Sequence, residues 1–340
     1  MVRPAIEARE AVWRELVAKS LAWQPGGGTE GNRRPPLVLS SPLEWTAEQW
    51  KDAALHVLQV EAELRKSGWT LGSAAPQWVQ FCGCRPVWIS QTALHPRRPG
   101  TWEAEQQFRR ELLAPLLERC GAKTGRLPWR VFLETTWRRV ARLALAAPDD
   151  LGWLREQVDR LAPRRRWSPW KCCESAREPS GLASVLVKEA AARLGARLVY
   201  EWRGSRPLCQ PLRPANGMAW VRFHQSEEEA AADYLDQRAV HGEVLPLWNR
   251  TGDPMQACPH RTPADLAVAV GRGNVPCAPT ELALFTRQLS RMAPVAMVEF
   301  IPERGGVEWE SFLGAVRGLF RVTSVVETGA GRRLCTLLRS

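Results

Sequence analysis

The stretch MAWVRFHQSEEEAAADYLDQRAVHGEVLPL, residues 218–247, decides the fold class because three structural signals follow one another within it. Met218 to Phe223 is an apolar, aromatic-rich run that is typical of a buried strand. Glu227 to Arg238 has the composition and length of a helix, and Val244 to Leu247 is a second apolar run. A strand, a helix and a further strand in this order predict a βαβ unit, whose two strands lie parallel in one sheet.

The alternation of strands and helices continues on both sides of this unit. We expect further strands over 197–202, 266–270 and 295–301, and helices over 182–194, 280–291 and 309–319. The last two apolar segments, 320–326 and 334–338, flank Gly329-Ala330-Gly331 and predict a closing antiparallel hairpin. We therefore predict an α/β, Rossmann-like domain over residues 171–340, with helices on both faces of a mostly parallel sheet.

The first half of the chain, residues 1–170, has a different pattern. Apolar residues recur at helical spacing, and Thr46 with Gln49 three residues later forms a capping-box signal. A short β-hairpin is expected near 78–90, around the turn Cys82-Gly83-Cys84-Arg85, and 163–170 is a basic, proline-containing linker. We predict a mostly helical region with helices over 5–23, 46–66, from Thr101 onward, 127–147 and 151–161.

Composition narrows the classes of function. The net charge is +11, which indicates either a phosphate-binding face or the compositional bias of an arginine-rich chain. The basic clusters at 33–34, 97–98, 138–139 and 164–166 are scattered, without a nucleic-acid motif around them, so nucleic-acid binding is kept only as a second alternative.

The lengths of the apolar runs and the number and spacing of the cysteines indicate the cellular compartment and whether a metal is bound. The chain contains no apolar run of bilayer-spanning length, and residues 1–23 read as an amphipathic helix instead of a signal peptide. Its nine cysteines form no CxxC pair. We therefore expect a cytoplasmic protein with reduced thiols, no membrane contact and no metal.

Several short sequence segments resemble those of a known protein family. They are the segment Gln77 to Ser90, Trp102, Gln107-Phe108, Leu113-Ala-Pro-Leu116, Ala264-Asp-Leu266, Asn274-Val-Pro276 and Val298-Glu-Phe-Ile-Pro302. From about Leu58 onward the chain resembles the nodulation-protein-type class I S-adenosylmethionine (SAM) methyltransferases of bacteria. The resemblance implies that the second domain has the class I methyltransferase sheet and that SAM is its cofactor.

The resemblance also implies which residues would bind SAM. The acid at the end of the first strand corresponds to Glu201, and the glycine-rich loop corresponds to a segment containing Gly204 and Ser205. Arg203 and Pro207 stand in that loop where glycines are expected, although glycine lets the backbone approach a cofactor closely. His224 occupies the place of the ribose-binding acid and Asn249 that of the adenine-side acid. We therefore expect SAM binding to be weak or absent.

Three functions remain open at this stage. The first is a methyltransferase-like protein with a degraded cofactor site that acts as a non-catalytic subunit, with a protein partner or a second copy of itself. The second is an active, atypical SAM enzyme with a small-molecule acceptor, for which His224 and Glu299 are the catalytic candidates and Asn274 and Glu299 the substrate-binding candidates. The third is a basic nucleic-acid-binding protein.

Overall fold

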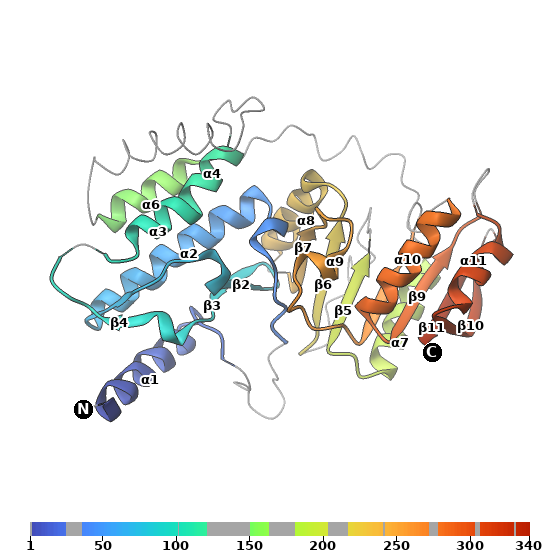
Figure 1. Cartoon of the computed structure of the whole chain (residues 1–340), viewed down its shortest axis with the longest axis horizontal. Helices are drawn as coiled ribbons and strands as arrows, with labels where there is room; N and C mark the ends of the chain where they lie inside the picture. Colours follow the sequence, from blue (N-terminus) through green and yellow to red (C-terminus); the bar gives the residue numbers. More distant parts are fainter. Residues whose placement is uncertain are drawn as a thin grey trace. The chain divides into compact units, whose positions relative to one another are not determined.

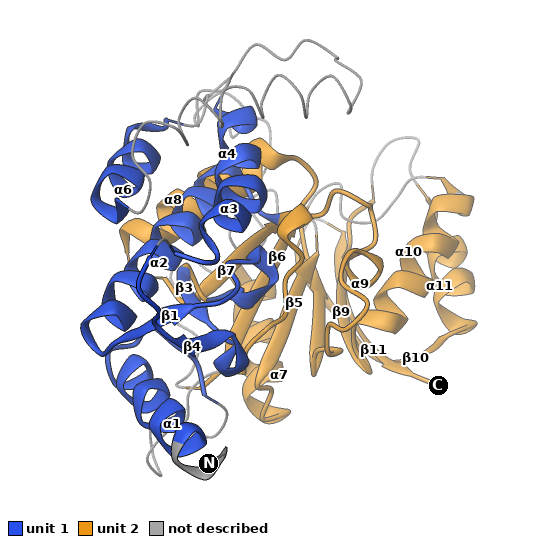
Figure 2. Cartoon of the chain, turned by 60° about the vertical axis from the view of Figure 1, so that its left-hand side comes forward, with its two compact units in different colours: residues 1–26, 45–81, 85–166 blue, residues 27–44, 82–84, 167–340 orange. Residues whose placement is uncertain are grey.

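The computed structural model describes residues 2–24, 36–100, 102–120, 150–162, 181–202, 217–240, 242–271, 278–302, 307–329 and 331–340 (Figure 1). The chain forms two compact units (Figure 2). The first unit comprises residues 1–26, 45–81 and 85–166, and the second comprises residues 27–44, 82–84 and 167–340.

The second unit is built on a seven-stranded sheet with the order β10-β11-β9-β8-β5-β6-β7. Its strands are β5 (Leu198–Trp202), β6 (Ala219–His224), β7 (Val244–Trp248), β8 (Leu266–Ala269), β9 (Val295–Phe300), β10 (Phe320–Gly329) and β11 (Arg332–Arg339). Strands β5 to β9 are parallel, whereas β11 runs antiparallel to both β9 and β10. The predicted α/β, Rossmann-like fold with a closing antiparallel hairpin is therefore confirmed.

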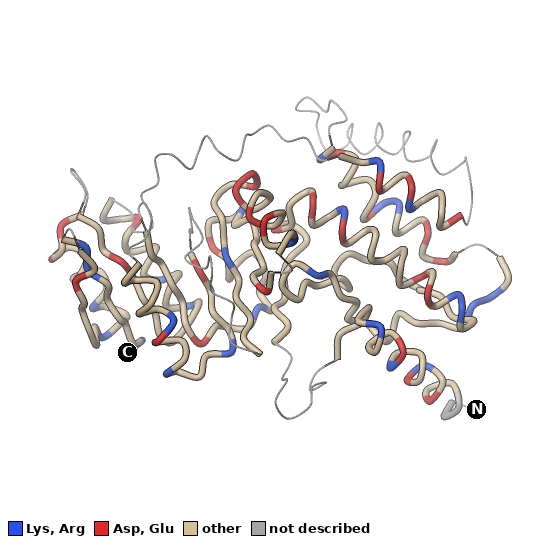
Figure 3. Tube along the Cα trace, turned by 180° about the vertical axis from the view of Figure 1, so that it is seen from behind, with Lys and Arg blue, Asp and Glu red and all other residues tan. Residues whose placement is uncertain are grey.

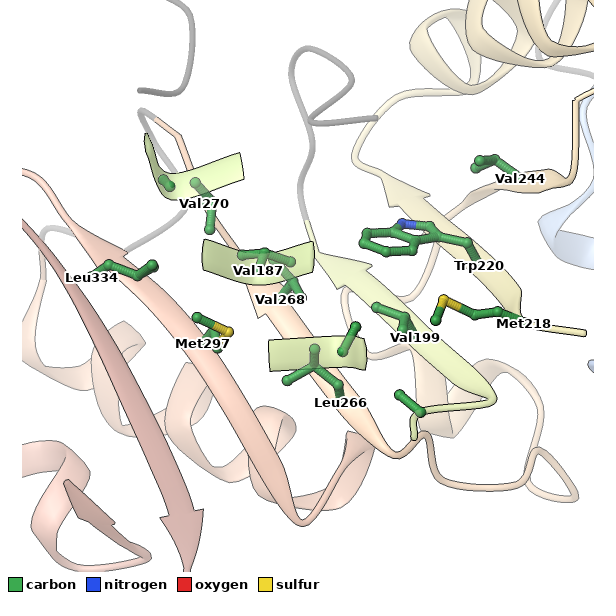
Figure 4. Packing of buried hydrophobic residues seen from close by; sticks show 13 residues of the cluster. Val187, Val199, Met218, Trp220, Val244, Leu266, Val268, Val270, Met297 and Leu334 are labelled. Carbon is green, nitrogen blue, oxygen red and sulfur yellow. The ribbon is translucent and has the colours of Figure 1, made fainter. Parts of the chain in front are cut away.

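Helices cover both faces of this sheet. They are α7 (Gly181–Arg193), α8 (Glu227–Ala239), α9 (Pro254–Ala257), α10 (Pro279–Met292) and α11 (Trp309–Arg317). Val187 of α7 packs with Val199 and Trp220 in a buried apolar cluster on one face (Figure 4). Side chains alternate between faces along a strand, and Trp202, of opposite parity to Val199, contacts Phe285 of α10. Helix α10 therefore lies on the face opposite to α7.

Two short segments from the first half of the chain belong to this second unit. In the first, the 3₁₀ turn η1 (Pro42–Glu44) ends in a buried carboxylate that pairs with the buried Arg261. Arg261 also donates to the Leu39 carbonyl (3.0 Å) and the Pro254 carbonyl (2.7 Å). These bonds hold residues 36–44 against the loop that follows α9.

The second segment is the turn of the β2–β3 hairpin. The Cys84 amide donates to the Gly242 carbonyl at 3.4 Å, and the Tyr234 hydroxyl donates to the Cys84 carbonyl at 3.0 Å. Gly83 has φ +60°, and a Cβ there would lie 2.7 Å from the Gly242 oxygen. Glycine is required at this position because the backbone is left-handed and because the two chain segments approach so closely.

The first unit contains α1 (Val2–Ala18), α2 (Ala47–Lys66), β1 (Trp69–Leu71), η2 (Pro76–Trp78), β2 (Val79–Cys82), β3 (Arg85–Trp88), η3 (Gln91–Ala93), β4 (Leu94–Pro96), α3 (Glu105–Phe108), η4 (Arg109–Leu113), α4 (Ala114–Arg119) and α6 (Leu151–Arg160). The predicted capping box begins α2, with the Gln49 amide donating to Thr46 Oγ1 at 3.3 Å and the Thr46 amide donating to Gln49 Oε1 at 2.9 Å. The β1–β4 pair was not predicted from the sequence, and the helix expected over 127–147 lies outside the described residues.

A buried histidine joins α2 to the segment that follows α1. His56 Nε2 lies 2.9 Å from the Leu21 carbonyl, to which it donates. Burial lowers the pKa of His56 to about 4, and the bond to Leu21 opposes this shift only in part. The imidazole therefore stays neutral at a pH where a solvated histidine is already protonated.

This depressed pKa predicts a loss of stability on mild acidification. As the pH falls below 6.5, the unfolded chain binds a proton at His56 before the folded chain does, so unfolding becomes more favourable until the pH reaches about 4. We expect about 2 kcal/mol of stability to be lost between about pH 7 and about pH 5 through this residue. Urea unfolding at the two pH values measures the loss. His56→Gln keeps a donor for the Leu21 carbonyl but does not titrate, so its loss of stability between the two pH values should be about 2 kcal/mol smaller than that of the native protein. Equal losses in the two proteins would show that His56 does not cause the pH dependence.

Candidate functional site

The residues expected at a cofactor site stand where parallel strands end. Glu201 is the penultimate residue of β5, His224 is the last residue of β6, and Asn249 directly follows β7. In the register of the sheet, Glu201 pairs with Arg222 and His224 pairs with Trp248. Ligands of open α/β sheets bind outside the carboxyl ends of the strands, at the point where the strand order reverses. In this sheet the order reverses at β5.

A buried guanidinium lies at the centre of this edge. Arg222 Nε donates to Glu201 Oε2 at 2.9 Å, and its Nη1 donates to Asp233 Oδ2 of α8 at 2.6 Å. Trp220 Nε1 donates to the same Glu201 oxygen at 3.0 Å. The Arg222 side chain is 0% exposed and that of Glu201 1%. The carboxylate of Glu201 is thus bound from within the protein, by a neighbouring strand.

His224 extends the network. Its Nε2 lies 2.9 Å from Asp233 Oδ2. Burial raises the pKa of Asp233, but the charge of Arg222 and the bond to His224 outweigh burial and hold that pKa below its usual value. An ionised carboxylate only accepts hydrogen bonds, so His224 Nε2 is the donor. Its other ring nitrogen, Nδ1, is buried and has no hydrogen-bond partner among the residues that the structure describes.

Asn249 lies beside His224. The Asn249 amide donates to the His224 carbonyl at 2.7 Å, which holds the ends of β6 and β7 together. The side chain is buried, and its Oδ1 has no partner within the described part of the chain. Two buried side-chain atoms without partners among the described residues, His224 Nδ1 and Asn249 Oδ1, therefore belong to neighbouring residues at the ends of β6 and β7.

Glu299 belongs to a different set of contacts. It lies on β9, is 0% exposed, and accepts from the Gly271 amide (3.0 Å) and from the Thr328 hydroxyl (3.0 Å). Arg332 Nη1 lies 4.0 Å from its Oε1. These bonds tie the start of the loop after β8 to the β10–β11 hairpin. In the sheet, β8 and β5 separate β9 from β6, which carries His224.

Gly204, Ser205 and Asn274 lie outside the described residues, as do the loop positions Arg203 and Pro207. Of the predicted site residues, the structure therefore brings together Glu201, His224 and Asn249. Sequence reasoning missed the two residues that connect them. Arg222 stands as a charge within an apolar strand, which is a readable signal of a buried pair, whereas its partner Asp233 lies in a polar helix and is not distinguished there.

Other kinds of site find no support in the described residues. No cluster of three or more His, Cys, Asp or Glu side chains there could hold a metal ion. Nor does any described helix have the length and apolar character needed to cross a bilayer. Acidic and basic residues are interspersed along the described trace (Figure 3). Of the four arginine clusters, only Arg97–Arg98 lies within it.

The fold defines a class of protein. The order of the parallel strands, with an antiparallel strand inserted between β9 and the edge strand β10, is that of the class I methyltransferase sheet. At the carboxyl edge of this sheet the carboxylate of Glu201 is bound to Arg222 and Trp220, and a histidine and an asparagine, His224 and Asn249, stand at the ends of the next two strands.

The chain is 38% identical over 87 residues to nodulation protein NoeA of Rhizobium meliloti (strain 1021). This confirms the resemblance to a nodulation protein, but the match spans only 25% of this chain and 18% of NoeA. No protein-family model matches the chain.

Solved structures show only distant similarity. Magnesium protoporphyrin IX methyltransferase from Synechocystis PCC 6803, with bound SAM, is 17% identical, with a TM-score of 0.36 over 47% of this chain and 79% of that chain. The PH0226 protein from Pyrococcus horikoshii OT3 is 10% identical, with a TM-score of 0.37 over 47% of this chain and 91% of that chain. The fold assignment rests on the strand order and not on these superpositions.

The buried network predicts a large effect of removing its cation. Arg222→Met leaves the Glu201 and Asp233 carboxylates without their shared guanidinium, and we expect a loss of about 3–5 kcal/mol in the free energy of unfolding. Chemical denaturation followed by tryptophan fluorescence measures it. The matched control is Arg193→Met, since that arginine is 81% exposed and should cost less than about 1 kcal/mol. Equal losses in the two variants would show that the network contributes nothing.

Proposed function

We propose that this chain is a class I methyltransferase-fold protein with a degraded cofactor site, and that it serves as a non-catalytic binding or partner subunit. The observation that supports the proposal most directly is the internal use of Glu201. Its Oε2 accepts from both Arg222 and Trp220. The carboxylate at the end of the first parallel strand is therefore already paired within the protein.

The expected weak binding of SAM has an electrostatic cause. SAM carries a sulfonium and an ammonium group, and carboxylates near these groups favour its binding. In this protein a fully buried arginine stands between Glu201 and Asp233 and offsets their negative charge. The other two acid positions are occupied by His224 and Asn249. A cationic cofactor therefore gains little attraction at this edge of the sheet.

A binding role agrees with the composition and surface of the chain. The chain has 17 tryptophans and is rich in arginine, and both residue types are enriched at interface hot spots. Leu43, Leu284 and Val240 of the second unit are 58%, 56% and 72% exposed. We propose a protein partner or a second copy of the chain as the binding target, in the cytoplasm of a bacterium.

A second candidate is an active, atypical SAM-dependent methyltransferase that acts on a small molecule. It is favoured by His224 Nδ1 and Asn249 Oδ1, which are buried at the carboxyl edge and lack partners among the described residues. These atoms could accept hydrogen bonds from the hydroxyl and amino groups of a cofactor. In this case Glu201, with its carboxylate paired to Arg222, would contribute less attraction for the cationic part of SAM than a carboxylate with no cationic partner.

Calorimetry separates the two candidates. We expect isothermal titration of the full chain with SAM and with S-adenosylhomocysteine to show no binding at low-micromolar concentrations, because no carboxylate among the described residues at this edge is left without a cationic neighbour. Circular dichroism of the same sample verifies that the protein is folded. Low-micromolar affinity for either compound would overturn the proposal and favour the enzyme.

A further inference from the structure

The two outermost strands of the seven-stranded sheet differ in their capacity to pair with a further strand. One is β7, which has five residues, carries Pro246 at its centre and is buried over its first four residues. The other is β10, which has ten residues and contains neither proline nor lysine (Figure 2). A bulge interrupts β10 between Val322 and Ser324, but residues 324–327 pair regularly with β11. Because proline and burial block strand addition, β10 is the more open of the two.

The middle of β10 is exposed on both faces of the sheet. Each residue from Thr323 to Glu327 is exposed, and the side chains of Val325 and Val326 are 45% and 38% exposed. Their neighbours on β11, Leu334 and Cys335, are buried. The outer side of β10 therefore offers backbone hydrogen-bonding groups next to apolar side chains, which is the arrangement that binds an added strand.

Charged residues of opposite sign stand at the two ends of this surface. In the sheet register, Arg321 is level with the first residue of β9, and Glu327 is level with the last. Helix α11 packs against β10, and only residues 318–319 separate the two, so the helix runs back towards the start of the strand. It carries Glu310 in its first turn and Arg317 in its last turn. Two cations therefore lie at one end of the surface and two anions at the other.

This charge pattern is complementary to itself. All four charged residues are exposed, and none of them has an ion-pair partner among the described residues. When two copies meet with their β10 strands antiparallel, a two-fold axis relates them, and the cationic end of each copy meets the anionic end of the other. Parallel strands would place like charges together, which is unfavourable. The pattern thus favours a second copy of this chain in one orientation.

We propose that two copies of this chain associate through the β10 edge surface, formed by the outer side of β10 and the exposed charges of α11, with the two β10 strands antiparallel. One continuous sheet then crosses the dimer, and Val325 and Val326 are buried at its centre. Burial of the valines and the new backbone hydrogen bonds stabilise the dimer. The net charge of +11 on each copy opposes it, and the paired ends offset that repulsion locally. The inference rests on the proposed binding role and specifies its partner.

Sedimentation equilibrium of the full chain measures the association. We expect a monomer–dimer equilibrium with a Kd of about 10 µM or tighter, as for an interface of modest size. Val325→Lys places a charge at the centre of the surface and should weaken association by about tenfold or more. Because Val325 is exposed in the single chain, this variant should stay folded, which circular dichroism verifies. Arg193→Glu is the matched control, since that arginine lies on α7, is 81% exposed and is outside the surface; its Kd should be unchanged.

Two double variants test the charge pattern itself. Arg317→Glu with Arg321→Glu makes both ends of the surface anionic, whereas Glu310→Arg with Glu327→Arg makes both ends cationic. Each double variant should be monomeric alone, because like charges then meet. An equimolar mixture of the two should form heterodimers, because an anionic surface then meets a cationic one. Association in the mixture also shows that both variants are folded.

Hydrogen exchange locates the interface. Amides of residues 321–327 should exchange more slowly at high protein concentration than at low concentration, whereas those of β7 should not change. A dimer whose β10 amides exchange at the same rate at both concentrations would have its interface elsewhere and would overturn the inference.

The outcomes are distinct from those of the titration with SAM. A chain that stays monomeric at about 100 µM, or a mixture of the double variants that forms no heterodimer, overturns this inference. If SAM also fails to bind, the proposed function is kept with a different protein as partner. A dimer that binds SAM at low-micromolar concentration supports this inference and overturns the non-catalytic role.

Discussion

The ion pairs of Arg222 with Glu201 and Asp233 organise the carboxyl edge of the central sheet. They connect β5, β6 and α8 through side chains that are at most 9% exposed. Desolvating such groups costs several kcal/mol each, and only good geometry with further hydrogen bonds offsets that cost. Arg222 and Glu201 are paired in the strand register, so a shift of one residue would move one of them to the opposite face. The network thus favours the observed alignment of β5 with β6, together with the apolar packing of Val199 and Trp220 on the same face.

The same interaction sets the distribution of charge at this edge of the sheet. At the carboxyl end of a parallel strand, a carboxylate without a cationic neighbour attracts cations, but Arg222 and Trp220 both donate to Glu201. Arg222 also pairs with Asp233, so that its single positive charge faces two carboxylates. Asp233 in turn accepts a hydrogen bond from His224. The polar atoms without partners among the described residues at these strand ends are a ring nitrogen and an amide oxygen, His224 Nδ1 and Asn249 Oδ1. The fold therefore keeps the geometry of a methyltransferase sheet while its edge offers a different chemistry.

Much of the fold could be predicted from the sequence, because each strand and helix carries its own periodicity. The βαβ segment 218–247, the Thr46 capping box and the closing hairpin are all local signals. What could not be predicted depends on contacts between distant residues. Glu44 pairs with Arg261 across 217 positions of the chain, and nothing near Pro42 indicates that this segment packs in the second unit. The π-helical turn Arg109–Leu113 precedes Pro115, whose missing amide and bulky ring disrupt a regular helix.

In the candidate site, too, some features can be predicted from the sequence and others depend on contacts between distant residues. The family resemblance indicated Glu201, His224 and Asn249, but their contacts depend on Asp233, which a helix on one face of the sheet brings to Arg222 and His224. Glu299 provides a useful contrast. It is also a buried carboxylate in a parallel strand, yet it accepts from a backbone amide and a hydroxyl, and it joins a loop to a hairpin. Replacing a buried ion network with apolar residues often leaves a protein equally stable. The contact between Asp233 and His224 is therefore not explained by stability alone.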